Sequence, residues 1–482
     1  MGLLGLTATG ICAMLGAAIN VIPFMILRNV PEIGPFVLPA YFFAAVPALL
    51  AALAYAILAS AMPRAGGSYV YASRALNPYL GFVASFSQWF GLSIAIGVVS
   101  YLLIPFLRDI ATAVGQQGLA VALETGPVRV GLALAFLWIF VGINLRGVSL
   151  YERTLVPLML LMFALGSVVI VAGFAFDQAD FAAALVERGE ALPPAGAGSP
   201  FRLGAFLAAG AILFSSFIGF DSVAQAGGEA RNPGRSLPLA IFLSVGIVGS
   251  FYLLFTAAVY HAVPWRYVAE RALAEDLTAP GLLGYLLSPG WTVAIVAGAA
   301  VALINDLPAM LLAVSRLMFA WAEDGIFPRV VARVHRSWHT PHVALLLSGL
   351  MASLGILGSH LAGDFFLGVD LLVTSMIVNF ILMCLSVLNL PRRNPHLAAA
   401  VGVVRARAVQ VPLATVGVVL LGLFLAFHVW KDLTSDVAWY LRSTVVWLAV
   451  MSLATIVYLR EMGTLRRSGV DVDAVFADLP PE

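Results

Sequence analysis

Apolar stretches of about 20 residues recur along this chain, and they constrain its fold more than any other feature. Each stretch is long enough to cross a hydrocarbon core of roughly 30 Å as an α-helix. Of the 482 residues, 61% are hydrophobic and 11% are charged, less than half the roughly 25% of charged residues usual in a soluble domain. The sequence therefore excludes a water-soluble enzyme, a nucleic-acid-binding protein and a secreted module.

These stretches predict an all-α integral membrane protein with about twelve transmembrane helices. A membrane β-barrel is excluded, because its strands alternate in polarity and cross the membrane in about ten residues. The predicted spans are 5–27, 37–61, 79–107, 130–145, 155–175, 204–226, 237–260, 288–320, 342–359, 365–390, 409–428 and 438–459.

The distribution of basic residues predicts the orientation of the chain. Cytoplasmic connections carry an excess of Lys and Arg. The connections on the N-terminal side hold 17 of the 26 basic residues, and the opposite side holds nine, including Lys431, the only lysine in the sequence. We therefore expect a multi-pass protein of the plasma (inner) membrane with both termini in the cytoplasm.

Two predicted spans contain residues that interrupt a membrane helix. The first span includes GICAMLGAAINVIP (10–23), and the sixth includes GAILFSSFIGFD (210–221). Unwound backbone at membrane depth is tolerated where it is buried in protein or lines a cavity. Interruptions at corresponding places in two halves of a chain predict an inverted repeat with a binding site at the midplane. The alternative is that these small residues serve close helix packing.

Two carboxylates, Asp221 and Asp306, fall inside predicted spans. Each costs at least about 2.5–3.5 kcal/mol at the bilayer centre, which favours a functional role over a structural, hydrogen-bonded one. Asp306, its neighbour Asn305 and the carbonyl freed by Pro308 predict a site for a proton or a small cation. We expect one of the two acids to titrate, and no cofactor or metal other than a coupling H⁺ or Na⁺.

Four long stretches of sequence carry a recognisable pattern, in this order: GICAMLGAAINVIP (10–23), AYAILASAMPRAGGSYVYASRALNPYLGF (54–82), FIGFDSVAQAGGEARNPGRSLPLAI (217–241) and SRLMFAWAEDGIFPRVVARVH (315–335). The chain resembles the amino acid–polyamine–organocation permeases in these motifs. The resemblance implies a 5+5 inverted repeat with discontinuous helices 1 and 6, followed by two C-terminal helices. The implied division is 1–175 and 204–390 for the repeats, 409–459 for spans 11 and 12, and 460–482 for a cytoplasmic tail.

The resemblance also implies where a substrate binds, between spans 1, 3, 6 and 8. A substrate carboxylate would meet the amides of the unwound first span, and an amino group would meet carbonyls, since half-helix ends and unwound carbonyls suit these charges. The residues implied are Gly16, Ala17 and Ala18 for the carboxylate, and Met14, Ser215 and Ile218 for the amino group. Polar side chains expected nearby are Ser93 and Ser216.

The sequence departs from the family pattern in the first span. Ala17 and Ala18 stand where the family commonly has Ser and Gly, and Asn20 replaces an aromatic residue. Asn20 fits either recognition of a polar substrate group or a hydrogen bond that caps the helix break. Some proton-coupled relatives carry a lysine in span 5, where Met162 stands here, so the coupling ion stays open.

The connections on the predicted inner side hold charges that suit a gate. Arg64 follows span 2 and Glu229 follows span 6. An ion pair between them would close the inner side of the molecule and separate when it opens. The alternative is that the arginines serve only as topology signals, which does not account for Glu229.

Together these features predict a secondary active transporter, a symporter or exchanger of a small amino acid or related amine, rather than an enzyme. No P-loop motif is present, which argues against an ATP-driven pump. The alternatives are a polyamine or cationic amine carrier and a non-transporting membrane sensor with the same fold. The expected partners are the small-molecule substrate and the lipid bilayer, with no nucleic acid.

Overall fold

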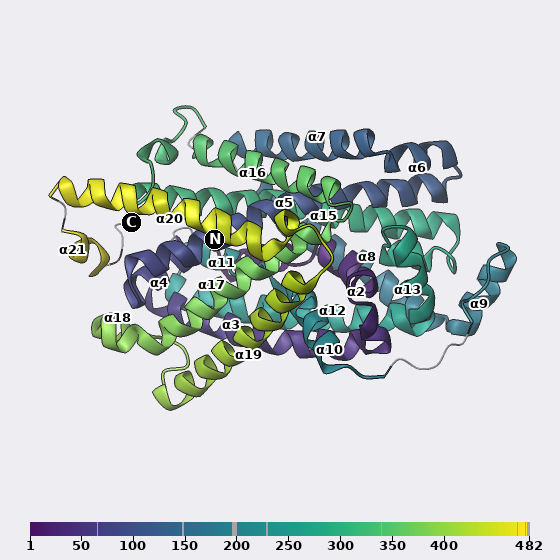
Figure 1. The fold of residues 1–482 in the computed structure, drawn as a ribbon, viewed down its shortest axis with the longest axis horizontal. Coiled ribbons are helices and arrows are strands. Elements are labelled where there is room, and N and C mark those ends of the chain that lie inside the picture. The colour runs from purple at the N-terminus through teal and green to yellow at the C-terminus, as the bar shows by residue number, and fades with distance from the viewer. Residues whose placement is uncertain are drawn as a thin grey trace.

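The computed structural model describes residues 1–64, 66–146, 149–194, 200–227, 230–338, 340–469, 471–477 and 479. All regular secondary structure in these residues is helical, and most of the long helices run along the horizontal axis of Figure 1. The predicted all-α architecture is therefore confirmed.

Ten long, continuous helices each fall on one predicted span. They are α3 (Val37–Ala61), α5 (Pro78–Ala113), α7 (Gly126–Leu145), α8 (Ser149–Ala175), α12 (Pro233–Ala262), α15 (Pro289–Glu323), α16 (His342–Leu361), α17 (Phe366–Arg393), α19 (Arg407–Thr434) and α20 (Ser443–Arg467). With the segment Leu203–Gln225, the described residues contain 11 helical segments that are long and apolar enough to cross a membrane. Helix α20 continues eight residues into the predicted tail.

The first and sixth predicted spans are broken, as the sequence predicts. The first consists of α1 (Leu3–Cys12) and α2 (Ala17–Asn29), each too short to span a bilayer alone. The sixth consists of α10 (Leu203–Leu213), a 3₁₀ turn η2 (Phe214–Phe217) and α11 (Ser222–Gln225). The symmetry that would relate the two halves as an inverted repeat stays a prediction.

Short helices lie at the two ends of the bundle. At one end are α4 (Gly67–Ala75), α18 (Pro395–Ala399) and α21 (Val472–Ala477), and at the other are α6 (Gln117–Glu124), α9 (Gln178–Glu187) and α13 (Trp265–Ala274) (Figure 1). The remaining short elements are α14 (Ala279–Leu283), η1 (Pro31–Phe36), η4 (Arg329–Ala332) and η5 (Trp439–Leu441).

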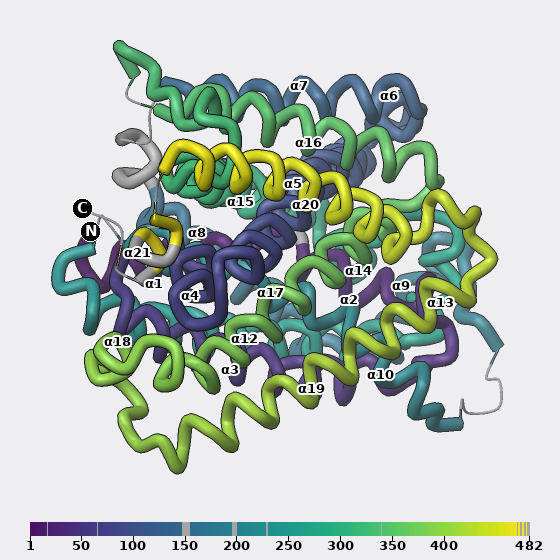
Figure 2. Tube along the Cα trace, turned by 60° about the vertical axis from the view of Figure 1, so that its left-hand side comes forward, coloured from purple at the N-terminus to yellow at the C-terminus, as the bar shows by residue number. Residues whose placement is uncertain are grey.

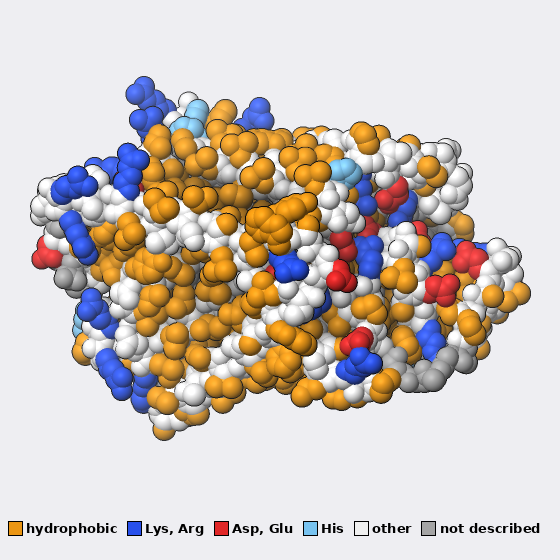
Figure 3. All heavy atoms as spheres, viewed as in Figure 1, with side chains coloured by type: hydrophobic (Ala, Val, Ile, Leu, Met, Phe, Trp, Pro, Cys, Tyr) orange, Lys and Arg blue, Asp and Glu red, His pale blue; other side chains and the backbone are white. Residues whose placement is uncertain are grey.

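The two ends differ in charge. Figure 3 shows basic side chains gathered over the end that carries α4 and α18, and a mixture of basic and acidic side chains over the end that carries α6, α9 and α13. We name them the basic end and the mixed-charge end. The N-terminus and the last described helix, α21, lie toward the basic end in Figure 2. Between the ends, the visible surface is mainly hydrophobic, as expected for a lipid-facing belt.

Helix α5 lies at the centre of the bundle. Of its most apolar 18-residue window, 94% is buried, against 28% for α7, α8, α19 and α20. It packs against α15, α16 and α17, whereas large side chains such as Leu160 of α8 and Leu453 of α20 point outward. The central position of α5 makes it the natural wall of any internal site.

Close contact between α5 and α16 depends on glycine. A Cβ on Gly97 would meet the carbonyl of Ala352, and a Cβ on Gly355 would lie 2.8 Å from the carbonyl oxygen of Ile94. Small residues let membrane helices approach backbone to backbone. These two glycines therefore set the distance between the central helix and its neighbour.

We predict that Gly97→Val lowers the free energy of unfolding in detergent by about 1–3 kcal/mol, because the added side chain forces α5 and α16 apart. The control is Gly142→Val in α7, where nothing lies within 4 Å of an added Cβ, and a change within about 0.5 kcal/mol is expected. Equal losses in the two variants would contradict the packing role of Gly97.

Candidate functional site

The two helix breaks touch each other at the centre of the bundle. Gly219 has a φ of 134°, a backbone conformation that favours glycine. A Cβ at this position would also collide with the carbonyl of Ala13, in the break between α1 and α2. Glycine is therefore required at 219 both for its backbone conformation and for the contact between the breaks.

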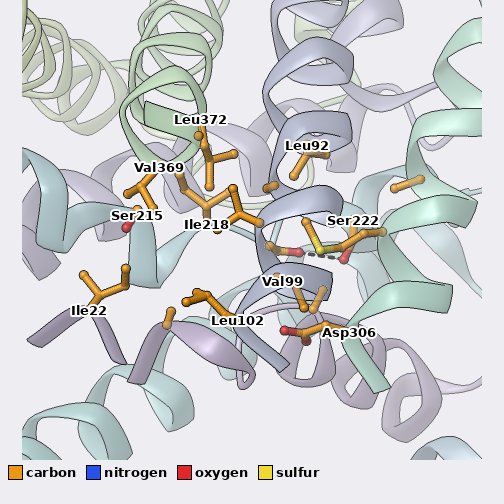
Figure 4. Close-up of a pocket in the computed structure, with 18 of the residues that line it drawn as sticks. Ile22, Leu92, Val99, Leu102, Ser215, Ile218, Ser222, Asp306, Val369 and Leu372 are labelled. Atoms are coloured by element: carbon orange, nitrogen blue, oxygen red, sulfur yellow. Dashed lines mark hydrogen bonds between the residues drawn. The ribbon is translucent and has the colours of Figure 1, made fainter. Parts of the chain in front are cut away.

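A cavity lies beside these breaks. Figure 4 shows lining side chains from several helices, with Asp306 on the opposite side of the view from Val369 and Leu372. The lining residues are Ala13, Ala18, Ile22, Leu92, Ala95, Val98, Val99, Leu102, Ser215, Ile218, Gly219, Asp221, Ser222, Asp306, Met310, Ala313, Gly368, Val369 and Leu372. The wall is thus largely aliphatic, with a few polar groups concentrated near the breaks.

Asp306 of α15 lies against the start of α2. A Cβ built on Gly16, the residue before the first turn of α2, would overlap the Asp306 carboxylate. Asp306 is 5% exposed and lines the cavity. Because the first turn of a helix presents free amides and positive potential, the position suits a carboxylate. The absence of a side chain at Gly16 makes this close approach possible.

Asp221 is completely buried and is held by hydrogen bonds. Its Oδ1 accepts from the amide of Gly219 at 3.1 Å, and its Oδ2 accepts from Nε2 of Gln88 in α5. The Gln88 Oε1 in turn accepts from the hydroxyl of Ser68 in α4. These bonds tie the broken sixth span to the central helix. Sequence reasoning missed Gln88, although an amide within an otherwise apolar span is a signal that could have identified it.

Some of the residues predicted to bind the substrate line the cavity. Ala18, Ser215 and Ile218 line it together with the two acids. The carbonyl of Ser215 accepts from the amide of Ile218 at 3.1 Å. Ser93 and Ser216 are buried but are not among the lining residues. Helix α17 contributes Gly368, Val369 and Leu372, which were not predicted, because an apolar span gives no sign of which face borders a cavity.

Other predicted residues lie behind the first break. The carbonyl of Met14 accepts from the hydroxyl of Tyr252 and from the amide of Gly16. Asn20 donates to the Gly16 carbonyl at 3.2 Å, a bond within the first turn of α2. Asn20 also lines a second, smaller cavity together with Met162.

Two further predicted positions complete this region. Asn305 lies 3.7 Å from the sulfur of Met162. Helix α2 begins at Ala17, whose side chain lies outside what the structure describes.

Residues 1–459 match the model of the amino acid permease family. The chain belongs to this family. The resemblance in the four motifs is thereby confirmed, and so is the interpretation of the chain as a multi-pass membrane transporter rather than an enzyme.

Relatives of this permease differ in what their names say they carry. Human cationic amino acid transporter 4 is 28% identical over 73% of this chain, and the match spans 54% of that longer protein. The low-affinity putrescine importer PlaP of Escherichia coli K12 is 25% identical over 71% of this chain and 69% of its own length. The branched-chain amino acid permease BcaP of Bacillus subtilis is 26% identical over 93% of this chain and 92% of its own length.

At the basic end of the permease, two of the family motifs meet. Tyr69 of α4 donates its hydroxyl hydrogen to Asp324 at 2.7 Å, and Nη1 of the buried Arg74 lies 3.3 Å from the same carboxylate. Arg64 lies in the connection before α4 and is partly buried. Glu229, its predicted partner in a gate, lies outside the described residues, so that ion pair stays a prediction.

At the mixed-charge end, ion pairs link helices α2, α5, α6 and α7 of the permease with the connections that hold Asp276 and Asp364. Nη2 of Arg28, in the last turn of α2, lies 2.8 Å from Asp276 and 3.0 Å from Asp364. Arg129 of α7 contacts Asp276 at 2.5 Å. We call the whole set the ion-pair cluster, and its members are Arg28, Arg108, Asp109, Glu124, Arg129, Glu275, Asp276 and Asp364.

Helices α2 and α5 contribute residues to both the cavity and the ion-pair cluster, and on each helix the cluster residue lies nearer the mixed-charge end. On α2, Ile22 lines the cavity and Arg28 belongs to the cluster, and on α5 the corresponding residues are Leu102 and Arg108. Most residues of the cluster also line a further, wider cavity with a charged wall, which we call the basin. The cluster therefore stands between the cavity and this basin.

Two acids of the cluster have opposite pKa shifts. Burial raises the pKa of Asp276, but the guanidinium groups of Arg129 and Arg28 outweigh it, and the pKa lies below its ordinary value. For Asp364, burial outweighs Arg28, and the pKa lies above its ordinary value. Stability from a lowered pKa is lost only as the pH falls through that value. Acidification therefore neutralises Asp364 first, while Asp276 still holds both arginines.

We predict that Gln88→Leu lowers the free energy of unfolding by about 1.5–3 kcal/mol, because the buried Asp221 carboxylate loses a hydrogen-bond donor. The measurement is unfolding of the purified protein in detergent. Ser100→Ala is the control, since Ser100 is equally buried in α5 and its hydroxyl bonds to Ile96 of the same helix. A loss no larger than that of the control would show that Gln88 does not hold the break.

Proposed function

We propose that this chain is a secondary transporter that moves a small amino acid or an amine across the cell membrane by alternating access. The observation that carries the proposal is one cavity bordered by both helix breaks and by α5, α15 and α17. A substrate there contacts elements from both halves of the chain. Relative movement of those halves would then open the cavity to one side or the other.

The proposed orientation places the basic end in the cytoplasm. Support comes from the excess of Lys and Arg over that end in Figure 3, which the positive-inside rule assigns to the inner side. The mixed-charge end then faces outward, and the ion-pair cluster becomes the outer gate. Both termini are cytoplasmic in this arrangement.

The substrate and the coupling ion belong to this proposal as well. The names of the relatives include cationic amino acids, putrescine and branched-chain amino acids. Membership of the family is therefore compatible with several classes of substrate. We propose that a cation neutralises Asp306 in each transport cycle, with Asn305 beside it. An H⁺ or Na⁺ coupled to transport fits this role, and so does a positive charge on the substrate itself.

We predict that Ala95→Trp abolishes ligand binding and uptake, because an indole at this position fills part of the cavity wall on α5. The test is uptake into proteoliposomes, together with thermal stabilisation by a panel of amino acids and amines. Ala135→Trp, on an exposed face of α7, is the control and should retain both. Full uptake by the cavity variant would place the substrate elsewhere, and stabilisation without uptake by the wild-type protein would favour a sensor.

We predict that Asp276→Asn opens the outer gate at neutral pH, whereas wild-type protein stays closed at pH 5. Removing one partner of a buried ion pair costs about 3–5 kcal/mol, so labelling from outside should accelerate about tenfold or more. The probe is a cysteine introduced at Leu102, in a background without the native Cys12 and Cys384. Asp177→Asn, at an exposed helix cap of the same end, is the control. Unchanged labelling in Asp276→Asn would remove the cluster as a gate.

A further inference from the structure

The charge of the central cavity distinguishes between the two substrate classes of the proposed function. Among the described residues that line it, the ionisable side chains are Asp221 and Asp306, and Arg, Lys and His are absent. Both acids are nearly inaccessible to solvent. A cavity that holds acids and no base in low-dielectric surroundings favours cations and disfavours anions.

The place where a substrate carboxylate would be recognised already holds a carboxylate. The N-terminus of α2, a helix of 13 residues, offers amides and positive potential next to the cavity. Asp306 lies against that end, where a Cβ on Gly16 would overlap its oxygens. A second carboxylate brought in by a substrate would therefore meet a like charge at close range.

The other acid has a different environment. Asp221 accepts hydrogen bonds from Gln88 and from the amide of Gly219, and these bonds hold the break of the sixth span. The Asp221 carboxylate thus stabilises that break. Asp306, which comes from α15 and faces the first break, is the acid placed to contact a positive charge in the cavity.

The rest of the wall suits a hydrocarbon body. It is formed mainly by aliphatic side chains of α5 and α17, including Leu92, Val98, Leu102, Val369 and Leu372. Such a surface binds methylene groups and offers no partner for a second anionic group. An ammonium at Asp306 and an aliphatic chain along this wall would satisfy both parts of the cavity.

We propose that the substrate is an aliphatic amine that lacks a carboxylate, with its ammonium group bound at Asp306. This inference rests on the proposed function and narrows it. The carboxylate of Asp306 takes the place that a substrate carboxylate would otherwise occupy at the end of α2. The substrate cation neutralises Asp306, so that uptake follows the membrane potential without a sodium or proton gradient.

The test compares compounds that differ by one carboxylate. The pairs are 3-methylbutylamine with leucine, and 1,5-diaminopentane with lysine. Binding to the purified full-length protein is measured by thermal stabilisation. Uptake is measured in proteoliposomes with an inside-negative potassium diffusion potential, without sodium and without a pH difference. We expect each amine to bind about tenfold or more tightly than its amino acid and to accumulate under the potential alone.

The possible results separate the inference from the proposed function. Tighter binding or faster uptake of leucine or lysine than of the paired amine overturns the inference and leaves the transporter intact. Amine uptake that requires sodium or a proton gradient overturns the claim that the substrate supplies the neutralising cation. If a wider panel of amino acids and amines neither binds nor enters the vesicles, the proposed function fails as well.

Two variants test which of the two acids determines the preference for an amine over its amino acid. Asp306→Asn is expected to lower the ratio of amine to amino acid affinity about tenfold or more, because the end of α2 becomes available to a substrate carboxylate. Asp221→Asn is the matched control, and it should change the affinities of both compounds of a pair to the same extent. An unchanged ratio in Asp306→Asn, or a loss of the ratio in Asp221→Asn alone, would overturn the assignment to Asp306. The wild-type comparison stands even if a variant does not fold.

Discussion

An interrupted helix inside an apolar bundle needs partners for the backbone groups that the interruption frees, and the rest of this structure depends on how they are supplied. In the sixth span, Asp221 accepts from the Gly219 amide. In the first span, Tyr252 donates to the Met14 carbonyl. With these groups satisfied, both breaks persist side by side, and continuous helix does not fill the space that becomes the cavity.

The arrangement of spans could be predicted from sequence because the length and polarity of a membrane helix are properties of its own residues. The breaks were also visible, since Gly, Ser and Asp at mid-span conflict with a continuous apolar helix. The side-chain environment of the site could not be predicted in the same way. Which face of α17 borders the cavity, and whether Asn20 points to substrate or to its own backbone, depends on the rotation of each helix against its neighbours.

Partners from distant parts of the chain were equally inaccessible to sequence reasoning. Asp276 and Asp364 follow different helices, yet both contact Arg28 at the end of α2. At the opposite end, Tyr69 and Asp324 belong to two family motifs that are about 250 residues apart and meet in a hydrogen bond. The hydrogen bond gives a physical reason why the family motifs fall in the connections between spans. Partly buried charges there need fixed partners, whereas lipid-facing residues need only be apolar.

The same reasoning explains how one fold can serve different substrates. The free amides at the start of α2 and the carbonyls at both breaks belong to the backbone, so they are present whatever side chains the breaks carry. Selectivity must therefore come from side chains that approach these backbone groups from other helices. We propose that in this chain the side chain is Asp306, which reaches the first break from α15 because Gly16 leaves room for it. A single residue outside the interrupted first span would thus determine the charge at the end of α2 that faces the cavity.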